Sequence, residues 1–287
     1  MAIFQKAYRG YQGDLTSIFW RPLVITRYSL LAIINSRYFY ACLVIGLLPS
    51  LVTMSLIYVR YNLDMLIQFE IPIDELVRID ADFFADFMLR PQLQLVFLFI
   101  MFVAPTLATP DLRNNGLSLY LSRPISKTGY VIGKLLAIIS LCSLVTWVPG
   151  VLLFFFQAYM GGSDWFSQYY YLPFAIIAAS LIWITTLTLF ALAISALVKT
   201  ASIARVVFFG IMLVGAAFGG LSRTIIGGWY GSIFSLSDAE QAMVQTLFGI
   251  KNFSTMPSTG AAMVFGLFIS LSILILYRRI RGFEVVG

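Results

Sequence analysis

The residue types that carry most enzyme chemistry are scarce in this chain. It contains no histidine, which excludes imidazole metal ligands, Ser–His triads and imidazole proton relays. Its two cysteines, Cys42 and Cys142, lie in apolar runs, and we interpret them as small packing residues. No G-x-x-x-x-G-K-[ST] phosphate loop is present, and no cluster of acids indicates an intramembrane enzyme. We therefore expect no catalytic residue, bound cofactor or metal in this chain, and no enzyme activity.

The composition indicates a membrane protein. The chain is 60% hydrophobic and 11% charged, with a mean hydropathy of +0.90, which leaves too little polar surface for a soluble globule. Six apolar runs approach the length of about 20 residues needed to cross the hydrocarbon core. They centre on Tyr38–Tyr58, Leu93–Thr109, Tyr130–Gln157, Leu172–Leu197, Val206–Leu221 and Gly260–Tyr277.

The distribution of charge predicts the topology. With both ends of the chain in the cytoplasm, the inner loops hold most of the 19 basic residues and few of the 13 acids. This is the positive-inside pattern, and it explains the net charge of +6 without a nucleic-acid partner. We predict an all-α polytopic protein of six transmembrane helices in one domain, residues 1–287, located in the cell membrane.

Four segments outside the spans complete this domain. Residues 1–37 form a cytoplasmic or interfacial N-terminal region with a helix over Leu15–Asn35, in which Pro22 suits the first turn. Residues 59–92 form an external acidic loop, 110–129 a cytoplasmic loop, and 222–259 an external or re-entrant segment with short amphipathic helices.

The external loop carries an amphipathic pattern. Its apolar residues recur at helical spacing beside an acidic stripe that includes Glu75, Asp82 and Asp86, and Pro91 marks the expected helix end. The simplest interpretation is a solvated lid on the bundle. The alternative is contact between Glu75, Asp82 and Asp86 and a periplasmic or extracellular partner.

Between spans five and six, Ser237 and Glu240 match a capping box, and Gly249 suits a helix C-terminus. Gly215 and Gly219 in span five permit close helix approach, which is weak evidence for a dimer face. Hydroxyls within spans are expected to bond to their own helix or a neighbour. Lys134, at the inner end of span three, is expected to reach the headgroups.

The most informative segment lies between spans two and three. Asn114 or Asn115 suits a helix start, and Leu117, Tyr120 and Leu121 then share one face. Arg123 precedes Pro124, which ends that helix. Ser126 then caps a second helix that runs through Lys127 and Lys134 into the membrane. The pattern predicts a short surface helix joined rigidly to a spanning helix.

This segment resembles a known family. The stretch Gly116–Lys127, followed by Tyr130 and Gly133-Lys134, closely resembles the cytoplasmic signature of ABC-2 type ABC transporter permeases, and the layout of six spans is similar. The resemblance implies a coupling helix that docks on a separate ATPase. It assigns this role to eleven residues: Arg113, Asn114, Asn115, Gly116, Leu117, Tyr120, Leu121, Arg123, Pro124, Ser126 and Lys127.

The resemblance also implies partners. These are two ABC ATPase subunits, which carry the ATP and Mg²⁺, a second permease chain, most simply an identical one, and membrane lipid. Many family members carry a glutamate shortly before the glycine, whereas this chain has Asp111 further upstream and Arg113-Asn114-Asn115 between. The charge contact with the ATPase is therefore expected to differ.

Three interpretations remain to be separated. We favour the membrane-spanning subunit of an ATP-driven transporter, an exporter of a hydrophobic or amphiphilic substrate. The second is a non-transporting anchor that relays ATPase motion to an external partner protein. For the segment itself, the plainer alternative is a basic loop that only obeys topology, since Arg123 and Lys127 would serve that purpose.

Overall fold

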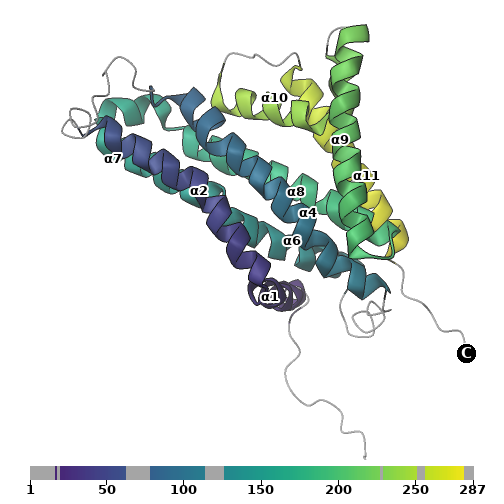
Figure 1. Ribbon diagram of the computed structural model, residues 1–287. Helices are drawn as coiled ribbons and strands as arrows, with labels where there is room; N and C mark the ends of the chain where they lie inside the picture. Colours follow the sequence, from purple (N-terminus) through teal and green to yellow (C-terminus); the bar gives the residue numbers. More distant parts are fainter. Residues whose placement is uncertain are drawn as a thin grey trace, which may run out of the picture.

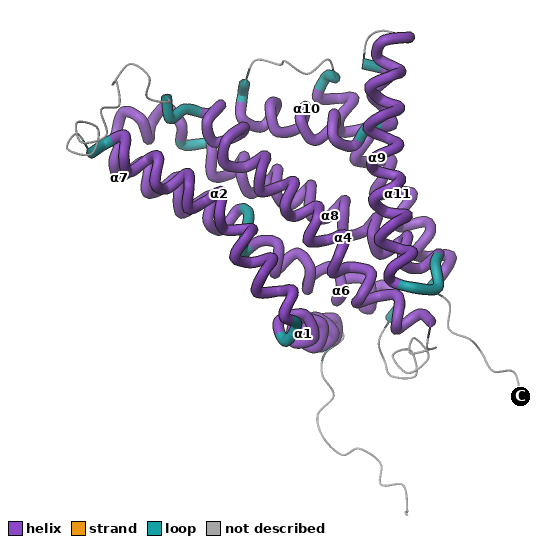
Figure 2. The backbone as a smooth tube through the Cα atoms, in the orientation of Figure 1, coloured by secondary structure: helices purple, strands orange, loops and turns teal. Residues whose placement is uncertain are grey.

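The fold is a bundle of long helices in a computed structural model, which describes residues 17, 20–62, 78–113, 126–226, 229–250 and 256–280. Within these ranges the secondary structure is helical, with short turns between the helices (Figure 2). Six helical stretches are long and apolar enough to cross a membrane. They are Phe39–Arg60, Phe83–Asp111, Lys127–Tyr169, Leu172–Leu197, Ala201–Ile225 and Ser258–Arg279. The prediction of a six-span all-α membrane protein is confirmed at this level.

The first two helices meet at a sharp corner. Helix α1 (Arg21–Ile34) has Pro22 in its first turn, as predicted, and α2 (Arg37–Arg60) follows after two residues. Figure 1 shows α1 nearly end-on below helices that run across the page, so α1 lies crosswise to the spans. Its buried residues are Ile25, Thr26, Ser29 and Ile33, which form the face turned toward the bundle.

The second span begins earlier than predicted. A π-helical segment, η2 (Phe83–Leu89), continues directly into α4 (Arg90–Arg113). Pro91 therefore does not end a helix, and the prediction of a separate surface helix over this stretch is wrong for its described part. Pro91 lies in the first turn of α4, where a missing N–H costs little. Phe83 and Phe84 are buried in the bundle core, so this stretch packs inward and does not lie on the surface.

The third span is broken into two helices. Helix α6 (Lys127–Ser143) ends three residues before α7 (Trp147–Tyr169) begins, and a further break occurs inside α7 at Gly162, where φ is +80°. Pro149 thus lies in the first turn of α7 and does not kink a continuous helix. Figure 1 shows α7 and α2 running together toward one side of the molecule.

The remaining helices form the centre and the other side. They are α8 (Leu172–Leu197), α9 (Ala201–Ile226), the 3₁₀ turn η3 (Tyr230–Phe234), α10 (Leu236–Phe248) and α11 (Ser258–Arg279). In its most apolar stretch α8 is 72% buried, whereas α9 is 11% buried. Helix α8 is therefore the axis of the bundle, and α9 lies at its periphery. Figure 1 places α1 and α10 at opposite ends, which we call the α1 end and the α10 end.

The glycine pair in α9 packs within the chain. A Cβ atom at Gly215 would lie 2.6 Å from the Phe234 carbonyl oxygen, and one at Gly219 would lie 2.6 Å from the Ser235 Cβ. Because the two glycines have no side chain, η3 and the start of α10 can pack closely against α9. The close approach predicted for this pair is present, but its partner is the next segment of the same chain.

Candidate functional site

A buried polar cluster lies at the α1 end, where α4 finishes and α6 begins. Lys134 Nζ lies 2.9 Å from Asp111 Oδ2, and the Tyr130 hydroxyl donates to the same oxygen at 2.9 Å. The Lys134 ammonium also lies 5.6 Å from the centre of the Tyr130 ring, within range of a cation–π contact. We call Asp111, Tyr130 and Lys134 the polar lock.

Burial makes the polar lock more than a surface ion pair. The Lys134 side chain is only 6% exposed, and that of Asp111 is 22% exposed. The expectation that Lys134 reaches the headgroups is therefore wrong, because the partner from α4 holds its ammonium inside the bundle. A buried ammonium without a counter-ion is strongly unfavourable, so Asp111 and Lys134 depend on each other. Separation of α4 from α6 at this point would leave both charges unpaired.

Local sequence explains how each member is positioned. Tyr130 and Lys134 are four residues apart on α6, so they share one face. Asp111 is in the last turn of α4, where the partial negative charge of the helix end disfavours a carboxylate. The lysine and the tyrosine hydroxyl offset that cost. Sequence reasoning missed this pairing, because Asp111 and Lys134 lie on opposite sides of residues 114–125 and no local pattern joins them.

An adjacent face of α6 holds α1. A Cβ atom at Gly133 would lie 2.7 Å from the Ile25 Cβ and 2.8 Å from the Pro22 carbonyl oxygen. The Thr26 hydroxyl is 3.1 Å from the Gly133 carbonyl oxygen, to which it can donate. Gly133 is therefore required by the contact with α1, and Lys134 by the contact with α4. Neighbouring residues of α6 tie two other helices to it.

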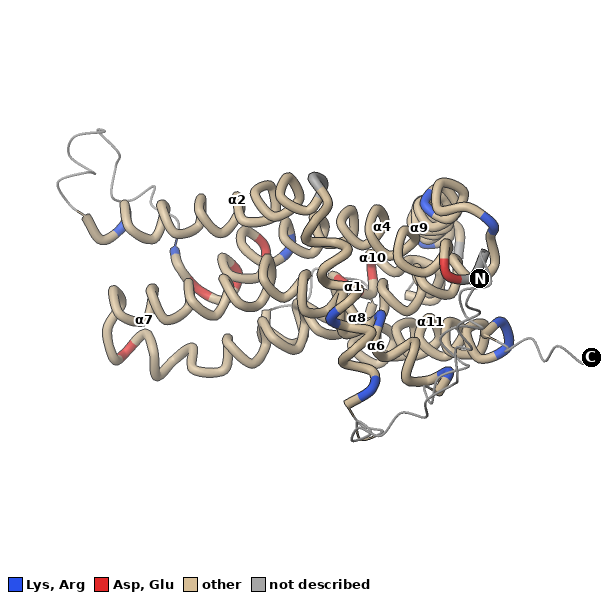
Figure 3. Tube along the Cα trace, turned by 90° about the horizontal axis from the view of Figure 1, so that it is seen from below, with Lys and Arg blue, Asp and Glu red and all other residues tan. Residues whose placement is uncertain are grey.

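An apolar cluster surrounds the polar lock and widens this junction. Its buried members include Ala108 of α4, Tyr130 of α6, Leu192 of α8 and Leu276 of α11, together with Ile25 of α1. Five helices therefore meet around the junction at the α1 end. The charged residues are few and the spans are uncharged over most of their length (Figure 3), which makes the buried Lys134 distinctive.

The predicted coupling residues fall partly within the described chain. Arg113 is the last residue of α4, and Lys127 is the exposed first residue of α6. The Ser126 hydroxyl accepts from the Gly129 N–H at 3.0 Å, which confirms the predicted N-cap. The other predicted coupling residues lie outside the described residues: Asn114, Asn115, Gly116, Leu117, Tyr120, Leu121, Arg123 and Pro124.

At the α10 end, two of the three predicted external contact residues are described. Asp86 forms an ion pair with Arg90 at 3.0 Å and is half exposed, while Glu75 lies outside the described residues. The pKa of Asp82 is raised, first by burial and then by the neighbouring Asp80 and Asp86. Asp82 and Asp86 thus lie at the start of the second span, and both residues are exposed, although Asp82 is partly desolvated.

Glu240 does not play its predicted role. The N-cap of α10 is Ser235, whose hydroxyl accepts from the Asp238 N–H at 3.2 Å, so the Ser237–Glu240 capping box is wrong. Glu240 is instead 6% exposed, and its Oε1 is buried without a hydrogen bond. Burial raises its pKa to about 7, with Arg90 opposing and Asp86 adding to the shift. The helix end at Gly249, in the left-handed conformation, matches the prediction.

Several hydroxyls within the spans bond to their own helices, whereas those of Ser180 and Thr188 in α8 are buried without a hydrogen-bond partner. Thr53, Ser143 and Thr186 each donate to the carbonyl four residues earlier, at 2.7, 2.7 and 2.8 Å. This confirms the structural role expected for them. Within the described part of the chain, no group of three or more His, Cys, Asp or Glu residues could hold a metal ion.

The contacts of the junction at the α1 end hold helices together. The junction ties together the two helix ends that flank residues 114–125, and it connects them to α1, α8 and α11. Comparison of the chain with protein-family models and with curated proteins finds no match.

Proposed function

We propose that this chain is the membrane-spanning permease subunit of an ATP-driven transporter of the ABC-2 type. The observation that carries the proposal is the junction formed by the polar lock and α1, because it braces both ends of the segment whose sequence resembles the family's coupling signature. The six apolar spans supply the body of a permease. No residue in this mechanism hydrolyses ATP, which is bound with Mg²⁺ by two separate ATPase subunits.

In this proposal the α1 end faces the cytoplasm, with both ends of the chain on that side. Helix α1 lies crosswise to the spans (Figure 1), an orientation that suits the inner membrane interface of a bacterial cell. Its buried face contacts α6, while Leu23, Tyr28 and Leu31 are exposed and face the lipid. A second copy of the chain completes the translocation path.

Force would pass through the polar lock. A push on residues 114–125 by the ATPase moves α4 and α6 together, because separating Asp111 from Lys134 would expose two charges to a region of low dielectric. The contact at Gly133 makes α1 follow α6. The helices around the apolar cluster then reorient as a group, which alternates access to a substrate path. The apolar interior favours a hydrophobic or amphiphilic substrate that is exported.

The subunit assignment is tested by purification from the native membrane followed by subunit counting. We expect two copies of this chain with two copies of an ATPase. Recovery of a stable monomer without an ATPase would overturn the proposal. Reconstitution of the complex in vesicles should give ATP-dependent substrate movement without an external protein. Coupled ATPase activity without such movement would favour the relay anchor instead.

The coupling role is tested on the segment itself. Leu117→Glu combined with Tyr120→Glu should abolish stimulation of the ATPase and transport, because it places charge on the predicted apolar docking face, while membrane insertion is retained. Ser122→Glu, which lies about 140° around the predicted helix from Leu117, is the matched control and should have little effect. Unchanged transport in the double variant would contradict the coupling role.

A further inference from the structure

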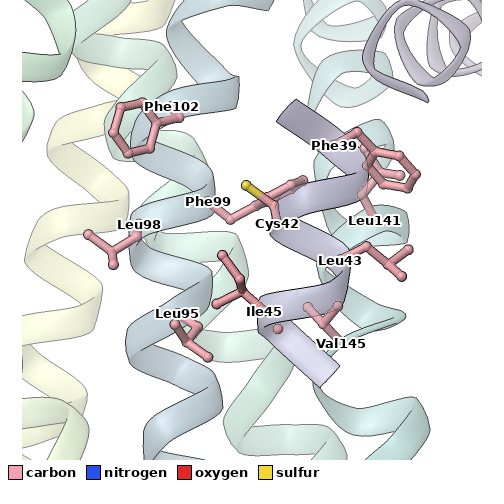
Figure 4. Close-up of a pocket in the computed structure, with 11 residues that line it drawn as sticks. Phe39, Cys42, Leu43, Ile45, Leu95, Leu98, Phe99, Phe102, Leu141 and Val145 are labelled. Atoms are coloured by element: carbon pink, nitrogen blue, oxygen red, sulfur yellow. The ribbon is translucent and has the colours of Figure 1, made fainter. Parts of the chain in front are cut away.

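An apolar groove opens between α2, α4 and α6. Its volume is about 180 Å³, and its walls include Phe39, Cys42 and Gly46 of α2 and Phe99 and Phe102 of α4. Figure 4 shows the Cys42 sulfur between the two helices, directed toward Phe99. At the floor, Val145 from the break between α6 and α7 lies so close to Gly46 that a Cβ there would be 3.0 Å from its Cγ1. The helix break therefore helps to form the groove.

The position of the groove determines which molecules can reach it. All of its lining residues belong to membrane-spanning stretches, so hydrocarbon surrounds its opening. The lining is almost wholly apolar, with the Cys42 thiol as its most polar group. Apolar cavities of roughly 150 Å³ stay dry and bind small hydrocarbons. A groove of this size and lining is therefore suited to several methylene groups of an acyl chain.

A cation lies beside one end of the groove. The Arg205 guanidinium of α9 lies 5.8 Å from the centre of the Phe102 ring, and Phe102 is part of the groove wall. Arg205 forms no ion pair within the described residues, and its Nε is buried without a hydrogen-bond partner. Arginine within a span is costly unless an anion pairs with it. A phosphate group suits the planar guanidinium, which can bind it through two parallel hydrogen bonds.

We propose that the groove and Arg205 together bind one anionic phospholipid of the surrounding bilayer. One acyl chain lies between α2 and α4, and the phosphate lies at Arg205, adjacent to Phe102. Arg205 is near the start of α9, at the α1 end, so the lipid belongs to the leaflet on that side. This goes beyond the permease function, because the site needs neither the ATPase nor transport.

The proposal is tested by photocrosslinking the chain, without any ATPase, in vesicles. The vesicles contain phosphatidylcholine and a fraction of phosphatidylglycerol with a photoreactive acyl chain, and a matched set carries the photoreactive group on phosphatidylcholine. In the wild-type chain we expect the label on peptides of α2 and α4. We expect about tenfold preference for the anionic lipid, because the choline cation of phosphatidylcholine offsets the charge of its own phosphate and repels Arg205. Equal labelling by the two lipids would overturn the proposal. A second copy of the protein crosslinked in the groove in place of lipid would also overturn it.

Three pairs of variants test the acyl-chain groove and the headgroup contact separately. Cys42→Phe fills the groove and should remove the label, whereas Val44→Phe, at an exposed position of α2 outside the groove, should retain it. Leu98→Trp and Leu152→Trp provide the same comparison from α4 and α7, should Cys42→Phe fail to fold. Arg205→Gln should keep the label but lose the anionic preference, and Arg205→Lys should restore it only in part, because lysine keeps the charge but not the two parallel hydrogen bonds. Loss of label in both control variants, or an unchanged preference in Arg205→Gln, would refute the site.

Discussion

Lys134 and Asp111 lie 2.9 Å apart across the two helices that flank residues 114–125, with the lysine almost wholly buried. The pair closes a loop of the chain at its base. The two helix ends are therefore held together, because neither can move away from the other without breaking a buried charge pair.

Removing one partner of the polar lock should destabilise the bundle. Lys134→Met leaves the Asp111 carboxylate partly buried without its counter-ion, and we expect a loss of about 2–4 kcal/mol. Thermal unfolding in detergent measures it. Lys127→Met, at an exposed position of the same helix, is the matched control. Combining Lys134→Met with Asp111→Asn should recover much of the loss, since no charge is then buried. A double variant worse than the single one would contradict the pairing.

Gly133 should tolerate no side chain. Gly133→Ala places a methyl group 2.7 Å from Ile25 Cβ and 2.8 Å from a backbone oxygen, so α1 must shift, at a cost of about 1–3 kcal/mol. Gly210→Ala meets nothing within 4 Å and should be neutral or stabilising by about 0.5–1 kcal/mol. Thermal unfolding, with limited proteolysis of α1, compares the two. Equal effects from both variants would refute the close contact.

The glycine pair of α9 should affect folding more than association. Gly219→Ala brings its Cβ to 2.6 Å from the Ser235 Cβ and should loosen α10 from α9. Gly220→Ala enters open space and serves as the control. The thermal unfolding temperature should fall only for Gly219→Ala, and the number of subunits in the complex should stay the same for both variants. A change in subunit count with unchanged stability would instead assign this face to a dimer.

Glu240 should make the packing of α10 depend on pH. Its folded-state pKa of about 7 exceeds the ordinary value of 4.5, so the folded protein binds the proton more tightly than the unfolded chain. The contribution of Glu240 to the free energy of unfolding is therefore fully present below pH 4.5. It declines as the pH rises toward 7. Thermal unfolding across this range measures the decline.

Glu240→Gln should flatten the profile, because the amide mimics the neutral acid. The neighbouring charges are Arg90, which lowers the Glu240 pKa, and Asp86, which raises it. Asp86→Asn is therefore a second check and should move the decline toward lower pH. A variant Glu240→Gln with the same pH profile as the wild type would contradict the assignment.

Local features of the sequence predicted much of the fold. The six spans follow from runs of apolar residues, and the positions of Pro22, Ser126 and Gly249 follow from backbone geometry in the first and last turns of helices. The prediction that Pro91 ends a helix was wrong, because a proline is compatible both with the end of one helix and with the first turn of the next. Only the inward packing of Phe83 and Phe84 decides between these alternatives.

The parts that sequence reasoning missed depend on which helices meet. Lys134 was expected at the headgroups because its neighbours along the chain offer no anion, and Asp111 approaches it only when α4 packs on α6. Glu240 fits a capping motif by spacing, yet the fold buries it. Hydropathy and helix caps are properties of consecutive residues, so the sequence by itself determined a six-span helical membrane protein. Charge pairing, burial of Glu240 and the close contacts of Gly133 and Gly219 join residues of different helices, so only the tertiary structure decided them.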